Sequence, residues 1–414
     1  MAASGPWQGV ARAAGLLTDD GATRPTIFAE MSALALATGS VNLGQGFPDD
    51  DGPASVKEVA AGALLDGVNQ YPPGPGIPAL REAVAAHQQR HYGIALDPDT
   101  EVLVTTGATE AIAAALLALL EPGDAAITLE PFYDAYAAIV ALTGAEHVTI
   151  PLLPTGEGFR PDLAALRVAA AHPAAKLLLL NSPHNPTGSV LRADELAAIA
   201  SAAVEHDLIV VTDEVYEHLT FDGAAHLPIA TLPGMRERTL TISSVGKTFS
   251  FTGWKVGWVS GPPELVDAAR AVKQFLTYVS GAPFQPAVAH ALNLETTDDP
   301  EAGFVVGLAA SLAHRRDLLV EGLEAVGLRT VPPQGTYFVV ADAGELIEAH
   351  GFTDAGDLAR ALPALCGVVA VPVSAFTHPG SVTDAALRSH VRFTFTKSED
   401  TLREAVTRLR RLRR

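Results

Sequence analysis

The stretch that decides the fold is residues 175–218, AKLLLLNSPHNPTGSVLRADELAAIASAAVEHDLIVVTDEVYEH. In it, two short apolar runs, LLLL and LIVV, flank an Ala-rich helical segment. Runs that are apolar at successive positions are typical of strands buried on both faces of a sheet. The order strand, helix, strand therefore predicts one crossover unit of a parallel sheet.

The same alternation extends over residues 100 to 260. Its strand-like runs are EVLVT, AAITLE, HVTIPL, AKLLLLN, LIVVTDE and RTLTISS, with Ala-rich helical stretches between them. Together they predict an α/β fold in which helices cover both faces of a mostly parallel central sheet.

The pattern changes after residue 295. A charged helical stretch over 301–326 precedes the strand-like runs GTYFVVAD, GVVAVPVS and HVRFTFT, which predict a smaller α+β domain. We expect an N-terminal arm with part of the small domain over 1–50, a large cofactor-binding domain over 51–295 and a small C-terminal domain over 296–414.

Composition excludes several classes of partner. The formal net charge of -19 repels phosphate polymers and anionic lipid, so we expect neither nucleic acid nor a membrane as a partner. The N-terminus lacks a signal-peptide pattern, and the apolar run at 111–120 is too short to span a bilayer. The single cysteine, Cys366, rules out an internal disulfide and a cysteine zinc site. We expect a cytoplasmic protein without a bound metal.

The tripeptide GKT at 246–248 is not the end of a phosphate-binding P-loop. That motif needs a glycine five positions before Gly246, and this chain has Thr241 there. Lys247 must therefore have another role.

Polar segments follow most of the predicted strands. They are TTGATE, EPFYD, NSPHNPTG, DEVYEH and SSVGKTFS. Because ligands of such sheets bind outside the carboxyl ends of the strands, we expect these segments to meet in one crevice.

The crevice has groups for a cofactor that carries a phosphate. Gly107, Ala108 and Thr109 lie at a strand-to-helix turn, where free backbone N–H groups and the helix dipole favour a phosphate. Ser244 adds a hydroxyl and Lys255 a positive charge.

Other side chains suit an aromatic cofactor ring with an aldehyde. Asp213, after a buried strand, can keep a ring nitrogen protonated, so that the ring accepts electrons. Asn185 and Tyr216 can hydrogen-bond a phenolic oxygen, and Tyr133 can stack on the ring. Lys247 can hold the aldehyde as a Schiff base.

These motifs carry a family resemblance. The chain resembles class I aminotransferases of fold type I, which use pyridoxal 5′-phosphate, through VNLGQGFPDDDGP, NQYPPGPG, GATEAI, NSPHNPTG, TDEVYEH, SSVGKTFSFTGWKVGW and HVRFTFTK. The resemblance implies a transaminase in which Lys247, Asp213 and Tyr216 are catalytic and the residues above hold the cofactor. One departure is Lys255, where many relatives have arginine, so this phosphate contact becomes a point charge.

The resemblance also implies contacts outside the crevice. Arg392 would bind the substrate α-carboxylate with two parallel hydrogen bonds, and Gly46 and Asn185 would help to bind the substrate. Tyr71 would reach the phosphate in a neighbouring subunit, which implies a homodimer.

The substrate is suggested only by overall similarity. The chain is most similar to actinobacterial N-succinyldiaminopimelate aminotransferases of lysine biosynthesis, with glutamate as amino donor, and also resembles kynurenine and glutamine transaminases. The candidates to face the substrate side chain are residues 29–46, Tyr278 and His184, with no obvious second arginine for a short dicarboxylate. His184 either touches substrate or is an exposed turn histidine.

Two other functions remain open at this point. A β-eliminating lyase or decarboxylase can use the same cofactor and the same fold, and the motifs do not separate it from a transaminase. A non-enzymatic binding domain is disfavoured, because both Lys247 and Arg392 are present and no DNA-binding segment precedes residue 40.

Overall fold

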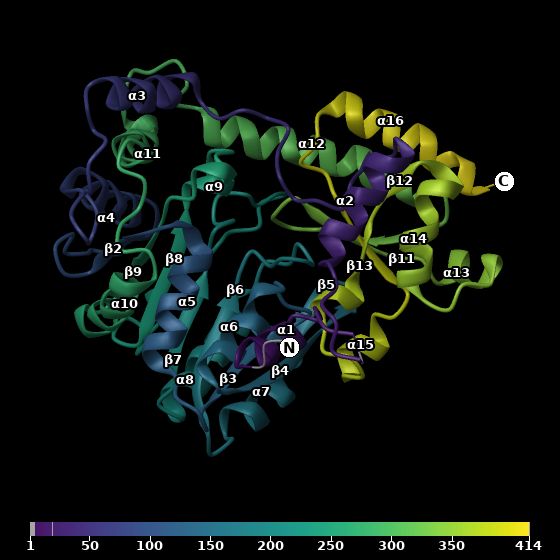
Figure 1. The fold of residues 1–414 in the computed structure, drawn as a ribbon, viewed down its shortest axis with the longest axis horizontal. Coiled ribbons are helices and arrows are strands. Elements are labelled where there is room, and N and C mark those ends of the chain that lie inside the picture. The colour runs from purple at the N-terminus through teal and green to yellow at the C-terminus, as the bar shows by residue number, and fades with distance from the viewer. Residues whose placement is uncertain (1–4, 19, 414) are drawn as a thin grey trace.

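The centre of the molecule is an eight-stranded sheet, seen in a computed structural model that describes residues 5–18 and 20–413 (Figure 1). Its strands lie in the order β2-β9-β8-β7-β6-β3-β4-β5. They are β2 (Val102–Thr105), β3 (Ala125–Glu130), β4 (Glu146–Thr155), β5 (Gly158–Pro161), β6 (Ala175–Asn181), β7 (Ile209–Asp213), β8 (Thr239–Ser244) and β9 (Gly257–Ser260).

Strand pairing confirms the predicted mostly parallel sheet. β4, β3, β6, β7 and β8 pair in parallel with their neighbours, whereas β9 runs antiparallel to both β2 and β8, and β5 antiparallel to β4. The short strands β5 and β9 were not among the predicted runs. β9 has four residues and begins at Gly257, so it lacks the continuous apolar pattern of the other central strands.

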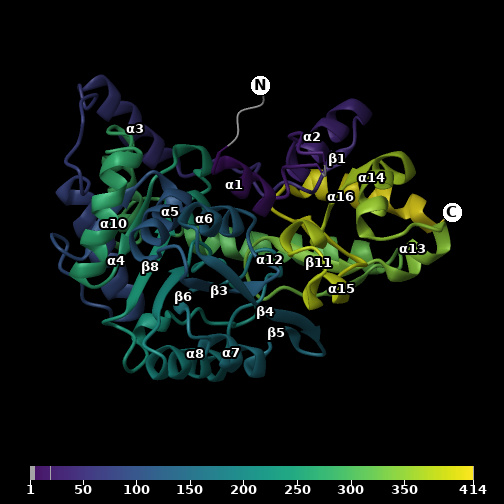
Figure 2. The same ribbon diagram turned by 60° about the horizontal axis from the view of Figure 1, so that its bottom comes forward.

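Helices cover both faces of the sheet (Figure 2). On one face, α5 (Gly107–Leu119), α6 (Ala135–Thr143) and α10 (Pro263–Leu276) pack on Leu177 and Leu179 of β6. On the other, α7 (Leu163–Ala170) and α8 (Ala193–Glu205) pack on Leu178 and Leu180. Since successive strand residues point to opposite faces, the four-leucine run of β6 supplies a core on each side.

A second, smaller part contains the C-terminal strands. β10 (Arg329–Val331), β11 (Phe338–Asp342), β14 (His390–Thr394) and β13 (Val371–Pro372) form an antiparallel sheet, and β1 (Val41–Asn42) pairs in parallel with β12 (Val368–Val369). β1 thus brings the segment near residue 42 to the C-terminal part. The domain boundaries at residues 50 and 295 stay a prediction.

The remaining helices lie around these two parts of the molecule. Figure 1 shows α12 running from one part to the other. These remaining helices are α1 (Trp7–Ala13), α2 (Ile27–Thr38), α3 (Ala54–Leu65), α4 (Pro78–Tyr92), α9 (Val245–Thr248), α11 (Phe284–Asn293), α12 (Phe304–Glu324), α13 (Gly344–His350), α14 (Ala355–Cys366), α15 (Val382–Ala386) and α16 (Glu399–Leu409). Within the described ranges, no helix combines the length and the apolar character that crossing a membrane requires.

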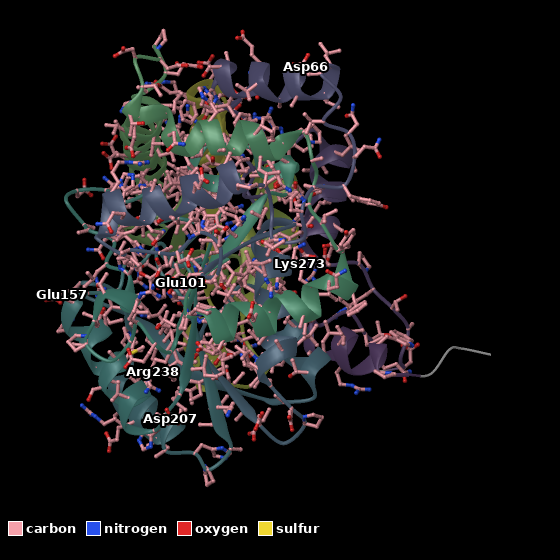
Figure 3. The ribbon with its side chains drawn as sticks, turned by 90° about the vertical axis from the view of Figure 1, so that its left-hand side faces the viewer. Asp66, Glu101, Glu157, Asp207, Arg238 and Lys273 are labelled. Carbon is pink, nitrogen blue, oxygen red and sulfur yellow. The ribbon has the colours of Figure 1, made fainter. Side chains whose placement is uncertain are left out.

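The amino ends of the parallel strands carry surface ion pairs. Arg238, before β8, donates from Nη1 to Asp207 Oδ1 at 2.9 Å, and Figure 3 shows both residues at one end of the sheet. Exposed pairs of this kind contribute roughly 0–1 kcal/mol each. The carboxyl ends of these strands, at the opposite edge of the sheet, carry the polar segments of the predicted crevice.

Candidate active site

A cavity of about 160 Å³ lies at the carboxyl ends of β6, β7 and β8, beside the first turn of α5. Ten residues predicted to contact the cofactor line it: Gly107, Ala108, Thr109, Tyr133, Asn185, Asp213, Tyr216, Ser244, Lys247 and Lys255. The structure thus brings five separate chain segments together, as the strand-end argument predicts.

Lys247 presents an amine in the cavity wall. It lies on the one-turn helix α9, directly after β8, and its side chain is half-buried. Its Nζ is 5.8 Å from the centroid of the Tyr216 ring and 5.6 Å from that of Tyr337. Two aromatic rings therefore lie close to the amine.

Asp213 is a buried carboxylate at the end of β7. Its Oδ2 accepts a hydrogen bond from the Tyr136 hydroxyl at 2.8 Å, and its Oδ1 accepts one from the Val215 backbone N–H at 3.3 Å. Burial raises the pKa of Asp213 to about 6, against the lowering effect of these hydrogen bonds. A cationic partner in the cavity would favour the ionised form of this group.

Asn181 holds the loop that carries Asn185. Its Nδ2 donates to the Asp213 carbonyl at 2.9 Å, and its Oδ1 accepts from the Asn185 backbone N–H at 2.7 Å. The ends of β6 and β7 are therefore tied together, and Asn185 is held at the cavity wall.

Arg392 reaches Asn185 from the small sheet. It lies on β14 and is 2% exposed, its Nη1 donates to Asn185 Oδ1 at 3.0 Å, and its Nη2 donates to the Gly44 carbonyl at 2.9 Å. Its Nε is buried and has no hydrogen-bond partner among the described residues. A buried cation with an unused N–H donor is suited to bind an anion.

Aromatic rings exclude water from the Arg392 guanidinium. Its Cζ is 5.5 Å from the ring centroid of Phe28, 4.0 Å from that of Phe338 and 4.6 Å from that of Phe376. Burial lowers the pKa of Arg392 to about 10, so the group stays charged at neutral pH.

The start of α5 is shaped like an anion cradle. No side chain caps this helix. Gly107 has φ +77°, and a Cβ there would lie 3.2 Å from Lys255 Nζ. A Cβ on Gly257 would lie 2.7 Å from the Gly107 carbonyl carbon. The two glycines thus allow the strand, the helix start and the lysine to approach closely, which is the arrangement that binds phosphate.

Three of the residues predicted to bind the cofactor or the substrate lie outside this cavity. Tyr71 is 80% exposed, with its ring 5.4 Å from that of Tyr278. The Gly46 carbonyl accepts a hydrogen bond from the Tyr337 hydroxyl at 2.6 Å, and a Cβ on Gly46 would clash with Phe338. Arg392 adjoins the cavity through Asn185 rather than lining it.

His184 is not an exposed turn histidine, so that alternative is wrong. The residue is 2% exposed, and its Nδ1 lies 2.8 Å from Thr187 Oγ1. Burial lowers its pKa to about 3. It packs inside the NSPHNPTG loop and does not line the cavity.

Sequence reasoning missed several residues of the site, chiefly Tyr136, Asn181 and Tyr337. Asn181 ends the AKLLLLN run, and Tyr136 comes two residues after the EPFYD segment that holds Tyr133, so their positions beside predicted site residues were a usable signal. Tyr337 gave no such signal, because it directly precedes β11 of the small sheet, far in the sequence from the predicted crevice segments.

The chain is similar to known proteins over most of its length. The family model for aminotransferase class I and II matches residues 38–409. A probable N-succinyldiaminopimelate aminotransferase of Mycobacterium tuberculosis is 55% identical over 388 residues, which cover 93% of this chain and 95% of the relative.

Other relatives are named for different amino acid substrates. The methionine aminotransferase of Escherichia coli is 38% identical, covering 94% of this chain and 96% of its own. Kynurenine–oxoglutarate transaminase 3 of Homo sapiens is also 38% identical, covering 91% and 86%. The solved N-succinyldiaminopimelate aminotransferase structure from M. tuberculosis superposes with a TM-score of 0.88 at 54% identity, covering 94% of this chain and 97% of that one.

Proposed function

Because this chain belongs to the class I and II aminotransferase family, we propose that it holds pyridoxal 5′-phosphate in the cavity and acts in lysine biosynthesis. It transfers an amino group between glutamate and the 2-oxo acid that corresponds to N-succinyl-LL-2,6-diaminopimelate. The chain is a transaminase, and its substrates are amino acids and 2-oxo acids. The observation that carries the specific substrate is the 55% identity over 93% of the chain to the mycobacterial relative, against 38% for the methionine and kynurenine enzymes.

The residues of the cavity fit the proposed cofactor. The uncapped start of α5, Ser244 and Lys255 suit its phosphate. Buried Asp213, whose pKa is raised by burial, suits its protonated ring nitrogen, and Asn185 and Tyr216 suit its phenolic oxygen. When bound, pyridoxal phosphate supplies an electron sink for the negative charge that develops at the substrate Cα.

In this proposal Lys247 does two things. Its amine would hold the cofactor by the aldehyde in the resting enzyme. When a substrate amine takes that place, the freed Lys247 amine would serve as the base that removes the proton from the substrate Cα and as the acid that returns it. Its position at the cavity wall, close to the rings of Tyr216 and Tyr337, holds the amine ready for both tasks.

Arg392 binds the α-carboxylate of the substrate. Its unpaired Nε offers a donor, and the three phenylalanine rings around the guanidinium strengthen the contact by excluding water. Because the amino acid and the 2-oxo acid use this site in turn, ping-pong kinetics are expected.

A panel of amino donors and 2-oxo acids, scored by kcat/KM, tests the substrate. We expect the N-succinyl-diaminopimelate and 2-oxoglutarate pair to rank first. The alternative is a kynurenine, glutamine or methionine type of aminotransferase, which the 38% identical relatives support. If one of those amino acids is preferred by tenfold or more, about 1.4 kcal/mol in transition-state binding, the lysine-pathway assignment is wrong and the transaminase assignment stands.

The same panel separates transamination from β-elimination. A transaminase needs an amino acceptor for repeated turnover, whereas a lyase releases its 2-oxo acid without one. We therefore expect steady 2-oxo acid formation from the donor only when an acceptor is added. Sustained release from a cysteine conjugate without an acceptor would reveal β-lyase activity at the same site.

We further infer a homodimer in which Tyr71 reaches the partner's site. Tyr71 lies beside an exposed apolar patch, with Phe275 89% exposed, Leu276 46% and Tyr278 40%. Single exposed apolar residues are common, but a cluster of this kind marks an interaction surface. The cytoplasmic location stays a prediction from the sequence.

Light scattering at assay concentrations checks the homodimer. We expect a dimer, and we expect Phe275→Asp to shift it toward monomer, because a charge would be buried at the interface. Val168→Asp is the matched control, since Val168 is 76% exposed on α7, away from the patch. A monomer with full activity would contradict the inference.

A further inference from the structure

A cluster of histidines lies outside the cavity, where α4 packs against the segment that follows β7. His87 and His91 lie one turn apart on α4, and His218 comes five residues after Asp213. One ring nitrogen from each histidine lies within 4.8 Å of the others. The three rings are in mutual contact, with centroids 4.6 to 4.9 Å apart.

Two of the three rings are joined directly. His87 Nε2 and His218 Nε2 form a hydrogen bond at 2.7 Å. Tetrahedral zinc, with Zn–N bonds of about 2.0–2.1 Å, spaces its ligand nitrogens roughly 3.3 Å apart. When zinc binds, the closest pair of ring nitrogens would move slightly apart and the most distant pair would move together, both by small side-chain rotations. Histidines four residues apart on one helix face are a common source of two metal ligands.

One histidine of the cluster is buried in the core. His87 is 3% exposed. His87 Nδ1 is buried and has no hydrogen-bond partner among the described residues.

One carboxylate contacts the cluster. Glu295 Oε1 lies 2.7 Å from His91 Nε2. Such groups orient ligand histidines and offset the charge of a divalent ion.

From this geometry we propose that His87, His91 and His218 bind one zinc ion, with Glu295 or water as the fourth ligand. Imidazole ligands favour zinc over magnesium or calcium, which prefer oxygen. The sequence predicts no metal, because His218 is more than 120 residues from the other two and only the packed fold brings it to them. The ion would join α4 to the segment that carries Asp213 and Tyr216, so its role is structural.

Zinc content and affinity test the proposal on the untagged, cofactor-loaded protein. We expect about one zinc per subunit by mass spectrometry after incubation with excess zinc followed by dialysis into metal-free buffer, and a rise in Tm when zinc is added to the metal-free protein. Loading with cobalt should give the visible absorption of a four-coordinate site with nitrogen ligands. None of these readouts depends on turnover.

Two variants and a control assign the site. His91→Gln should fold normally, because that side chain is only partly buried, and should weaken zinc binding at least tenfold; His87→Gln should do the same. His314→Gln is the control, since His314 is a surface histidine on α12, and should bind zinc like the parent. Less than stoichiometric zinc in the parent, or unchanged affinity in His91→Gln, would overturn the proposal.

Discussion

Lys247→Ala is expected to abolish turnover while the protein still binds its cofactor. Only the covalent link and the proton transfer are removed, whereas the α5 amides, Ser244 and Lys255 still hold the phosphate. General acid and base catalysis alone contributes about 10²–10⁴-fold, so a loss of at least this size in kcat should accompany the loss of the visible absorbance of the lysine-bound cofactor. Steady-state assay and absorption spectra of the same sample measure both.

The matched control is Lys176→Ala, which removes an exposed lysine at the start of β6. It should keep the parent's spectrum, cofactor content and activity. Full activity in Lys247→Ala would exclude Lys247 as the catalytic amine. Loss of the cofactor together with activity would instead show that the covalent link, rather than the phosphate contacts, provides most of the binding.

Asp213→Asn is expected to retain the cofactor and to lose most of its rate. A neutral amide does not hold the positive charge on the ring nitrogen, so the electron sink weakens. We expect kcat to fall by more than about tenfold, or about 1.4 kcal/mol. A smaller loss would mean that another residue keeps the ring protonated. Asp66→Asn, at an exposed position after α3 (Figure 3), is the control and should leave kcat unchanged.

Asp213→Asn should also change how the free energy of unfolding of the cofactor-free protein depends on pH. The folded-state pKa of Asp213, about 6, lies above its ordinary value of 3.8, so the folded state binds this proton more tightly than the unfolded state. The contribution of this group to stability is therefore fully present below pH 4 and is lost as pH rises through 6. Asp213→Asn should remove that part of the pH dependence, as measured by urea unfolding.

Most of the cofactor side of the site was predictable from the sequence. The groups that line the cavity follow directly after buried strands, and a strand buried on both faces is recognisable from local sequence alone. Asp213 and Lys247 were found in this way, whereas Arg392 and Tyr71 entered only through family resemblance. The alternative that His184 is an exposed turn histidine was wrong, because a turn-like sequence does not show whether the loop is buried.

By itself, the sequence determined the parallel sheet, the order of its strands along the chain and the chemistry at their ends, since apolar runs and the residues after them are local features. Only the tertiary structure decided which distant groups meet. Arg392 comes to Asn185 from 207 positions away, and Tyr337, directly before β11, lies close to Lys247. His87 and His91 reach His218 only because α4 packs there. Burial is a property of the whole packed molecule, so the raised pKa of Asp213 and the unpaired Nε of Arg392 arise only when the two sheets come together and exclude water.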